Sequence, residues 1–350
     1  MKTAFILTDG QLDKTVCKTA HGLIFGHSRY KILGVIDSEN AGKDAGEVVT
    51  KQKKDIPVFS STQQGMEILG IKPYYCVIGV APVGGKLSDS LVDAITDAIS
   101  SGINIVSGLH TLLNHHPVIA PLAQEKNVKL IDIRKPKSSA ELNPWSGKIA
   151  SVKTPRVAVI GTDCALGKRT TAGLLLDLCN ENHIKAEMIY TGQTGWLQGM
   201  KYGFILDSTL NDFVSGEMEQ AILRCVNEAS PDIIFIEGQS ALRNPSGPCG
   251  AEHLLSAGSK YVILQHCPSR KYFKGDTEQN YKIPDIKEEV ELIKFYGAEV
   301  IAITLNSEGL AQDEMEKIKN EIHEKTKLPV VYPREQGVTA LLPILKKIIG

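Results

Sequence analysis

The clearest chemical pattern in this sequence is a lysine that follows a glycine-bounded loop. The stretch RVAVIG, residues 156–161, is rich in β-branched residues and predicts a buried strand, and a helix is expected to begin near Gly167. Backbone N–H groups of such a loop, the positive end of the helix and the lysine together bind phosphate groups. The sequence therefore predicts a phosphate-binding loop made of Gly161, Thr162, Asp163, Cys164, Ala165, Leu166, Gly167, Lys168, Arg169, Thr170 and Thr171.

This loop departs from the standard pattern in two ways. Five residues, rather than four, separate Gly161 from Gly167, and the residue after the lysine is Arg169 instead of Ser or Thr. Thr170 or Thr171 would then supply the hydroxyl that such loops give to Mg²⁺, while Arg169 either adds a phosphate contact or lies on the surface. Cys164 fits as a small residue in a tight turn, with a nucleophilic role as the alternative.

An acidic residue ends a second apolar run. Glu237 follows the predicted strand at 233–236, which is where P-loop proteins place a carboxylate that holds Mg²⁺ directly or through water. It is equally suited to act as a general base, or only to bond backbone N–H groups. Asp163 and Asp212 are further carboxylate candidates, although Asp212 is better placed as the N-cap of a helix over residues 213–229.

More polar side chains follow other predicted strands. His266 is a candidate acid–base group, Arg270 is suited to clamp a carboxylate or phosphate, and Asn306 is either a base-reading residue or a turn residue. Ligands of open α/β sheets bind beyond the carboxyl ends of the strands, so these motifs are expected to converge. We expect the substrate to contact Thr191, Gly192, Gln193, Thr194, Gln239 and Arg270.

The predicted elements alternate between strand and helix along the whole chain, which predicts two doubly wound α/β domains. A segment rich in proline and serine, residues 136–155, is expected to link a Rossmann-like domain at 1–135 to a P-loop NTPase-like domain at 156–350. Asp37 occupies the place of a ribose-binding acid, but the first turn lacks GxGxxG, so a dinucleotide site is weakly supported. His110, His115 and His116 lack the further ligands that a metal site needs.

Composition excludes several classes of protein. The 39 basic and 40 acidic side chains leave almost no net charge, so neither nucleic acid nor a membrane surface is expected as a partner. No apolar run is long enough to cross a bilayer, and the first residues do not form a signal peptide. The seven cysteines are scattered without CxxC spacing, which favours a reducing, cytoplasmic location.

Several stretches together resemble a known family. These are GTDCALGKRTT at 161–171, TGQTG at 191–195, DFVSGE at 212–217 and IEGQ at 236–239, with KTAHGL at 18–23 near the start. Together they resemble the D-glutamate N-acetyltransferase (DgcN-like) family, which combines a Rossmann-like N-terminal domain with a P-loop C-terminal domain. The resemblance implies an N-acetyltransferase of amino-acid metabolism that moves an acetyl group from acetyl-CoA to D-glutamate or a related amino acid. The predicted partner is therefore a small-molecule amino acid, and we expect the chain to be a homo-oligomer.

The loop alone is also similar to that of dethiobiotin synthetase, with the same five-residue gap. That likeness implies the alternative, an ATP- and Mg²⁺-dependent ligase that activates a carboxylate, with Thr170 and Glu237 as the metal-binding residues. Arg169 stands where those enzymes have a threonine, which weakens this reading. A third hypothesis is a nucleotide-binding regulator without an enzymatic product.

Overall fold

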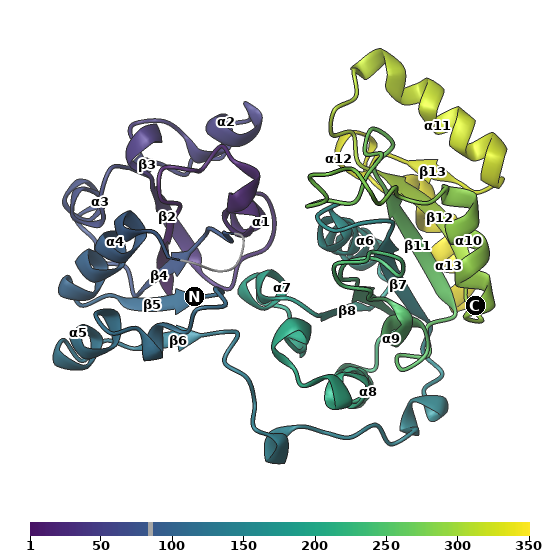
Figure 1. Cartoon of the computed structure of the whole chain (residues 1–350), viewed down its shortest axis with the longest axis horizontal. Coiled ribbons are helices and arrows are strands. Elements are labelled where there is room, and N and C mark those ends of the chain that lie inside the picture. The colour runs from purple at the N-terminus through teal and green to yellow at the C-terminus, as the bar shows by residue number, and fades with distance from the viewer. Residues whose placement is uncertain (83–86) are drawn as a thin grey trace. The chain divides into compact units, whose positions relative to one another are not determined.

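The computed structural model describes residues 1–82 and 87–350 and divides into two compact α/β units (Figure 1). The N-terminal unit contains Met1–Lys137 and Gln193–Met200, and the C-terminal unit contains Ser138–Gly192 and Lys201–Gly350. Each unit is built on one parallel sheet. The predicted fold class is confirmed. Within the described ranges, no helix is both long and apolar enough to cross a membrane.

The N-terminal unit has a six-stranded sheet in the order β3-β2-β1-β4-β5-β6, which is the strand order of the doubly wound Rossmann fold. Its strands are β1 (Thr3–Leu7), β2 (Lys31–Ile36), β3 (Val58–Phe59), β4 (Tyr75–Ile78), β5 (Asn104–Ser107) and β6 (Leu130–Asp132). Its helices are α1 (Lys18–Phe25), α2 (Ala45–Thr50), α3 (Thr62–Leu69), α4 (Asp89–Ser100), α5 (Ile119–Glu125) and α7 (Gln193–Leu197).

The C-terminal unit has a seven-stranded sheet in the order β13-β12-β11-β7-β10-β8-β9. Its strands are β7 (Arg156–Gly161), β8 (Ala186–Tyr190), β9 (Tyr202–Gly203), β10 (Ile233–Glu237), β11 (Tyr261–His266), β12 (Glu299–Leu305) and β13 (Val330–Val331). Its helices are α6 (Lys168–Glu181), α8 (Asn211–Ala229), α9 (Ala251–Leu254), α10 (Ile286–Phe295), α11 (Gln312–Thr326), α12 (Pro333–Gln336) and α13 (Leu342–Ile349).

The central strands of this sheet are buried on both faces. Val157, Val159, Ile234, Phe235 and Ile263 are all fully buried, because helices cover both sides of a parallel sheet. β7 pairs with β10 on one side and with β11 on the other. The packed strands therefore hold the loops at their carboxyl ends in fixed positions, and these loops carry the polar motifs.

The middle of the segment expected to be a linker, residues 143–149, is hydrogen-bonded to α8. Buried Glu219 accepts hydrogen bonds from the Ser146 N–H and hydroxyl and from the Ile149 N–H, at 2.6–2.9 Å. Glu217 accepts two more from the backbone and side chain of Asn143. Glu217 is the last residue of DFVSGE and Glu219 lies just beyond it, so both carboxylates hold the start of the C-terminal unit against α8.

Two further details differ from the sequence reading. Asp212 does not cap a helix, because α8 begins at Asn211 and Leu210 occupies the N-cap position; Asp212 lies in the first turn, where its charge meets the positive helix end. Gln193–Met200, expected in the C-terminal domain, packs with the N-terminal unit. Within that unit, the Arg29 guanidinium lies over the Trp196 ring and donates to the Trp196 carbonyl.

Candidate phosphate-binding site

The loop between β7 and α6 has the geometry of an anion-binding turn. Gly167 precedes α6 with φ of +100°, a conformation that favours glycine because it has no Cβ. A Cβ on Gly161 would lie 3.1 Å from the Gln265 carbonyl oxygen and 3.2 Å from Cδ of Lys168, so this position is also tight. The fourteen-residue helix that follows directs its N-terminal N–H groups toward the loop.

Lys168 is folded into the loop rather than extended into solvent. Its side chain is only 6% exposed, and Nζ donates to the backbone carbonyls of Asp163 at 2.7 Å and Ser240 at 2.8 Å. Burial lowers the pKa of Lys168 to about 8, because the charged amine loses hydration that two carbonyls only partly replace. A phosphate oxygen in place of one carbonyl would stabilise the charged form.

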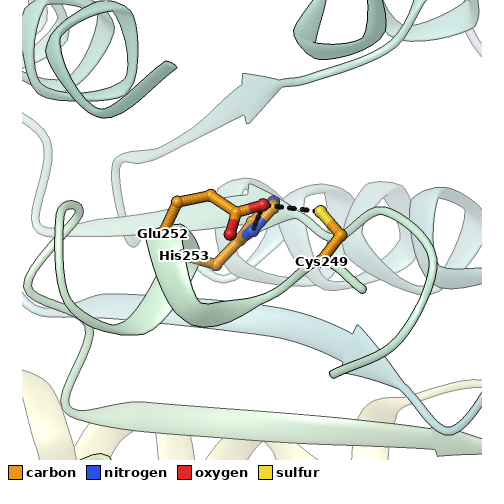
Figure 2. Close-up of side chains that lie close together, drawn as sticks. All are labelled: Cys249, Glu252 and His253. Carbon is orange, nitrogen blue, oxygen red and sulfur yellow. Dashed lines mark hydrogen bonds and ion pairs between the residues drawn. The ribbon is translucent and has the colours of Figure 1, made fainter. Parts of the chain in front are cut away.

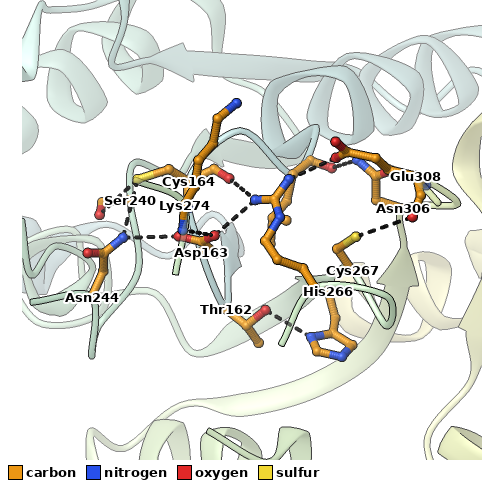
Figure 3. A network of polar contacts seen from close by, with 12 residues as sticks. Thr162, Asp163, Cys164, Ser240, Asn244, His266, Cys267, Lys274, Asn306 and Glu308 are labelled. Atoms are coloured by element: carbon orange, nitrogen blue, oxygen red, sulfur yellow. Dashed lines mark hydrogen bonds and ion pairs between the residues drawn. The ribbon is translucent and has the colours of Figure 1, made fainter. Parts of the chain in front are cut away.

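Asp163 binds the loop together instead of facing a ligand (Figure 3). Its side chain is fully buried, and Oδ1 accepts from the Cys164 N–H and from Nδ2 of Asn244. Its Oδ2 accepts from Nη1 of Arg270 and from the Lys274 N–H, both at 2.9 Å. All four donors satisfy the carboxylate, so Asp163 is a structural centre of the loop.

Arg270 is engaged by the protein. Nη1 also donates to the Cys164 carbonyl at 2.8 Å, and Nη2 donates to Glu308 at 2.8 Å. The guanidinium thus connects the loop after β7 to the loop after β12. In this arrangement the Arg270 side chain holds the phosphate loop in place. A ligand carboxylate that bound Arg270 would have to displace Glu308 from Nη2.

His266 and Asn306 also contact the loop. Nδ1 of His266 lies 2.9 Å from the Thr162 hydroxyl, and burial lowers the pKa of this histidine to about 4, with Arg270 adding to the effect. The ring is therefore neutral at neutral pH. Nδ2 of Asn306 donates to the Leu166 carbonyl at 2.9 Å, so its amide supports the loop from the end of β12.

Glu237, Thr191 and Gln239 form a second group beside the loop. The Glu237 side chain is buried at the end of β10, and one of its carboxylate oxygens accepts from the Thr191 N–H at 3.0 Å. The Thr191 hydroxyl donates to the Glu237 carbonyl and accepts from Nε2 of Gln239. Burial raises the pKa of Glu237, while Arg169 and the N–H groups of Thr191 and Gly192 oppose that rise.

The residues after the lysine have different environments. Thr171 is buried and donates to Oε1 of Gln265 at 2.6 Å, so its hydroxyl belongs to the core. Thr170 is half-buried and lines a small pocket with Asn306 and Arg334. Nη1 of Arg169 is buried and has no hydrogen-bond partner among the residues described. A buried, unpaired guanidinium nitrogen beside Glu237 is suited to an anionic ligand.

Two expected substrate residues are bound within the N-terminal unit. Oε1 of Gln193 accepts from Nη2 of Arg134 at 2.6 Å, and the Thr194 hydroxyl lies 3.3 Å from that of Thr19. Both residues follow Gly192, where the chain passes from one unit to the other. Asp37 likewise has local partners, since it accepts from the Thr8 hydroxyl and the backbone N–H groups of Leu12 and Asn40.

Comparison with known proteins identifies the family. Residues 143–342 match DUF1611_C, a P-loop domain of unknown function, and residues 38–136 match DUF1611_N, a Rossmann-like domain of unknown function. The chain belongs to the DUF1611 family. A solved DUF1611 protein from Anabaena variabilis is 27% identical, with a TM-score of 0.88 over 99% of this chain and 100% of that one.

Two curated relatives of this DUF1611 protein carry a functional name. A D-glutamate N-acetyltransferase from Pseudoalteromonas sp is 30% identical over 78% of this chain and 81% of its own length. Another, from Tritonibacter scottomollicae, is 29% identical over 77% of this chain and 80% of its own length. The expected family is confirmed, and the names support an enzyme of the transferase class.

The sequence reading of this DUF1611 chain missed several residues around the loop. Asn244, Lys274 and Glu308 contact Asp163 or Arg270, but each lies in an irregular segment far along the chain, and no local spacing marks it. It also missed the group Cys249, Glu252 and His253 near α9. The run Cys-Gly-Ala-Glu-His at 249–253 contains three ligand-type residues within five positions, and that signal was available.

Proposed function

We propose that this protein transfers an acetyl group from acetyl-CoA to the amine of D-glutamate or a related amino acid. The observation that carries the proposal is a phosphate-binding loop in a chain that aligns, over more than three quarters of its length, with two proteins named D-glutamate N-acetyltransferases. Coenzyme A carries phosphates that such a loop can hold, and its thioester supplies the acetyl group.

The residues present fit a CoA diphosphate. Lys168 donates to two backbone carbonyls that a phosphate oxygen can replace, and Nη1 of Arg169 is buried without a partner in the described structure. The N–H groups at the start of α6 add a third source of positive potential. In this proposal Gly161–Thr171 holds the phosphates, and Arg270 and Asn306 position the loop rather than touch the substrate.

Glu237 is assigned as the proton acceptor. As the amine nitrogen bonds to the thioester carbon, the carbon–sulfur bond breaks, CoA leaves as the thiolate and a proton moves from the amine to the carboxylate. Burial raises the pKa of Glu237, which makes it a better base than an exposed glutamate. His266 is assigned a positioning role, because a pKa of about 4 makes it a weak base.

The acceptor amino acid is assigned to the group next to Glu237. Thr191, Gly192 and Gln239 surround this carboxylate, and Nε2 of Gln239 lies within 3.0 Å of the position that a Cβ on Gly192 would take. Backbone N–H groups in these turns are suited to stabilise the oxyanion of the tetrahedral intermediate. The tight approach at Gly192 limits the size of anything that binds there.

A second candidate is the ATP- and Mg²⁺-dependent carboxylate-activating reaction. It is favoured by the pairing of β7 with β10, which places Glu237 beside the loop that carries Thr170. It is opposed by Arg169, whose charge lies close enough to lower the pKa of Glu237 against the effect of burial. A resident guanidinium there would supply the positive charge that Mg²⁺ supplies in ATP-dependent relatives.

One assay separates the two reactions. Purified protein is incubated with acetyl-CoA and a panel of D- and L-amino acids, in Mg²⁺ or in EDTA, and thiol release is followed. We expect release with D-glutamate or a close analogue, unchanged by EDTA. Absence of thiol release across the panel, from protein that is folded by circular dichroism, would reject the proposal. ADP formation that requires Mg²⁺ and an acid would establish the second candidate.

A further inference from the structure

Three side chains with metal-binding atoms meet near α9 in the C-terminal unit (Figure 2). Sγ of Cys249 lies 2.5 Å from Oε1 of Glu252, and Nδ1 of His253 lies 3.4 Å from the same oxygen. The three ligand atoms all lie within 4.8 Å of one another. It is the one such group of three or more His, Cys, Asp or Glu side chains found in the residues described.

The ring of His253 is held at one nitrogen and, within the ranges that the structure describes, unsatisfied at the other. Nε2 of its ring lies 3.0 Å from the Glu237 carbonyl oxygen, and because a carbonyl only accepts, Nε2 carries the hydrogen. The other ring nitrogen, Nδ1, faces the Glu252 carboxylate. The ring is fully buried, and Nδ1 has no hydrogen-bond partner in the described part of the chain. A buried nitrogen without a hydrogen bond, 3.4 Å from a carboxylate oxygen, is satisfied by a proton on Nδ1 or by a cation that both atoms bind.

We propose that Cys249, Glu252 and His253 bind a zinc ion. A thiolate, an imidazole and a carboxylate are the ligand types that Zn²⁺ takes in proteins. The Glu237 carbonyl fixes the ring of His253 from its other nitrogen, which is the usual outer-shell support of a metal-binding histidine. Binding replaces the thiol proton of Cys249 with the metal, so one proton is released for each ion bound by this residue.

The dimensions of the group are compatible with tetrahedral coordination. With Zn–S of about 2.3 Å and Zn–N or Zn–O of about 2.0 Å, ligand atoms lie about 3.3–3.6 Å apart. The separation of Nδ1 and Oε1, 3.4 Å, already matches. Oε1 must move away from Sγ by about 1 Å, which rotation of the partly exposed Glu252 side chain permits. Three protein ligands leave the fourth position for water or for a group from a ligand.

The proposed ion would lie next to the phosphate loop. His253 contacts the backbone of Glu237, and the Cys249 thiol lies within electrostatic range of Lys168 and Cys164. An ion here would therefore add positive charge beside the loop. Its test needs no catalytic activity, so failure of the acetyltransferase proposal and failure of the zinc proposal are distinguishable.

The test is direct metal analysis of the full-length protein. Protein is stripped with a chelator, loaded with Zn²⁺, desalted and analysed by mass spectrometry of the metal, and its affinity is measured by competition with a chromophoric chelator. We expect one zinc per chain. Loading with Co²⁺ should give the near-ultraviolet absorption band of a cobalt–thiolate bond, which requires a cysteine ligand.

Matched variants locate the ion. Cys249→Ser and Glu252→Gln preserve shape and should each weaken zinc binding at least tenfold, and Cys249→Ser should abolish the cobalt–thiolate band. His115→Gln, in the histidine-rich segment of the other unit, is the control and should bind as the wild type does. Circular dichroism establishes that each variant is folded. Wild-type protein that retains no zinc would overturn the proposal, and so would variants Cys249→Ser and Glu252→Gln that bind zinc as tightly as the wild type does.

Discussion

Nη1 of Arg270 donates to Oδ2 of Asp163 at 2.9 Å, and this ion pair joins the loop after β7 to the loop after β11. Asp163 is fully buried and Arg270 is 14% exposed in its side chain, so water screens the pair poorly. The pair therefore contributes more to the shape of the phosphate loop than an ion pair on the surface would. Arg270 is expected from the sequence to clamp a substrate; since Asp163, the Cys164 carbonyl and Glu308 occupy its guanidinium in the structure, we propose that it supports the loop.

Arg270→Ala should destabilise the protein because it leaves the Asp163 charge buried with only neutral donors. Removing one partner of a buried ion pair lowers the free energy of unfolding by about 3–5 kcal/mol. Because the other donors to Asp163 remain, we expect a loss of about 3 kcal/mol. Glu308→Gln is the control, since Glu308 is 56% exposed and its pair with the same arginine should be worth about 1 kcal/mol or less. Denaturant unfolding measures both. Equal losses in the two variants would contradict the structural role of Asp163.

Lys168→Met should weaken CoA binding. Nζ is the one side-chain ammonium of the loop itself, and a hydrogen bond from a charged group contributes about 1.5–3 kcal/mol, or about 10- to 100-fold in affinity. Calorimetry with CoA measures the change, and Lys185→Ala, an exposed lysine before β8, is the control. CoA binding of unchanged affinity in Lys168→Met would place the phosphates elsewhere.

The same variant should change how stability depends on pH. Burial lowers the pKa of Lys168 to about 8, whereas an unfolded lysine titrates near 10.5. Between these values the unfolded chain binds the proton and the folded chain does not, so wild-type stability rises with pH. One pKa unit corresponds to about 1.4 kcal/mol, so the free energy of unfolding of the wild type should rise by up to about 3 kcal/mol relative to that of Lys168→Met between these two pKa values. A stability difference that stays constant from pH 7 to 10 would contradict this.

The local sequence was sufficient to predict the loop and its strands. Strand, loop and helix at 156–181 follow from β-branched residues, glycine and the Gly167–Lys168 pair, all within one stretch of chain. The strand ends at Glu237, His266 and Asn306 follow in the same way, because each apolar run ends at a polar residue. Parallel pairing then brings these ends to one edge of the sheet.

The partners of those residues could not be predicted, because they lie far apart in sequence. Lys274 donates to Asp163 across 111 positions, and no periodicity records that contact. The local sequence also does not predict that the chain passes from one unit to the other after Gly192, because TGQTG has the composition of a single continuous turn. His253 contacts the Glu237 carbonyl only because the irregular segment after β10 folds back. The run at 249–253 marks three ligand-type residues in the sequence, but their position beside Glu237 required the structure.

Glu237→Gln should reduce acetyl transfer by about 10²–10⁴-fold with little effect on CoA affinity, which is the usual range for loss of a general base. Because burial raises the pKa of Glu237, wild-type kcat/KM should fall as pH drops through that raised value, where the carboxylate takes a proton. Glu187→Gln is the control, because burial also raises the pKa of Glu187 but this residue lies near the start of β8. A pH profile that keeps its acidic limb in Glu237→Gln would assign the base to another residue.

Arg169→Thr should convert the loop toward a Mg²⁺-dependent nucleotide site. The substitution places a hydroxyl directly after Lys168, where P-loop enzymes bind Mg²⁺, and removes a positive charge from beside Glu237. We expect CoA to bind more weakly, because the unpaired Nη1 is lost, and ATP to bind more tightly in Mg²⁺ than in EDTA.

Arg169→Gln removes the charge without supplying a hydroxyl at that position, so it should lose CoA affinity without gaining Mg²⁺ dependence. Calorimetry with CoA and with ATP measures these affinities. If the wild type already binds ATP in Mg²⁺ as tightly as Arg169→Thr does, Arg169 is not the residue that disfavours the metal.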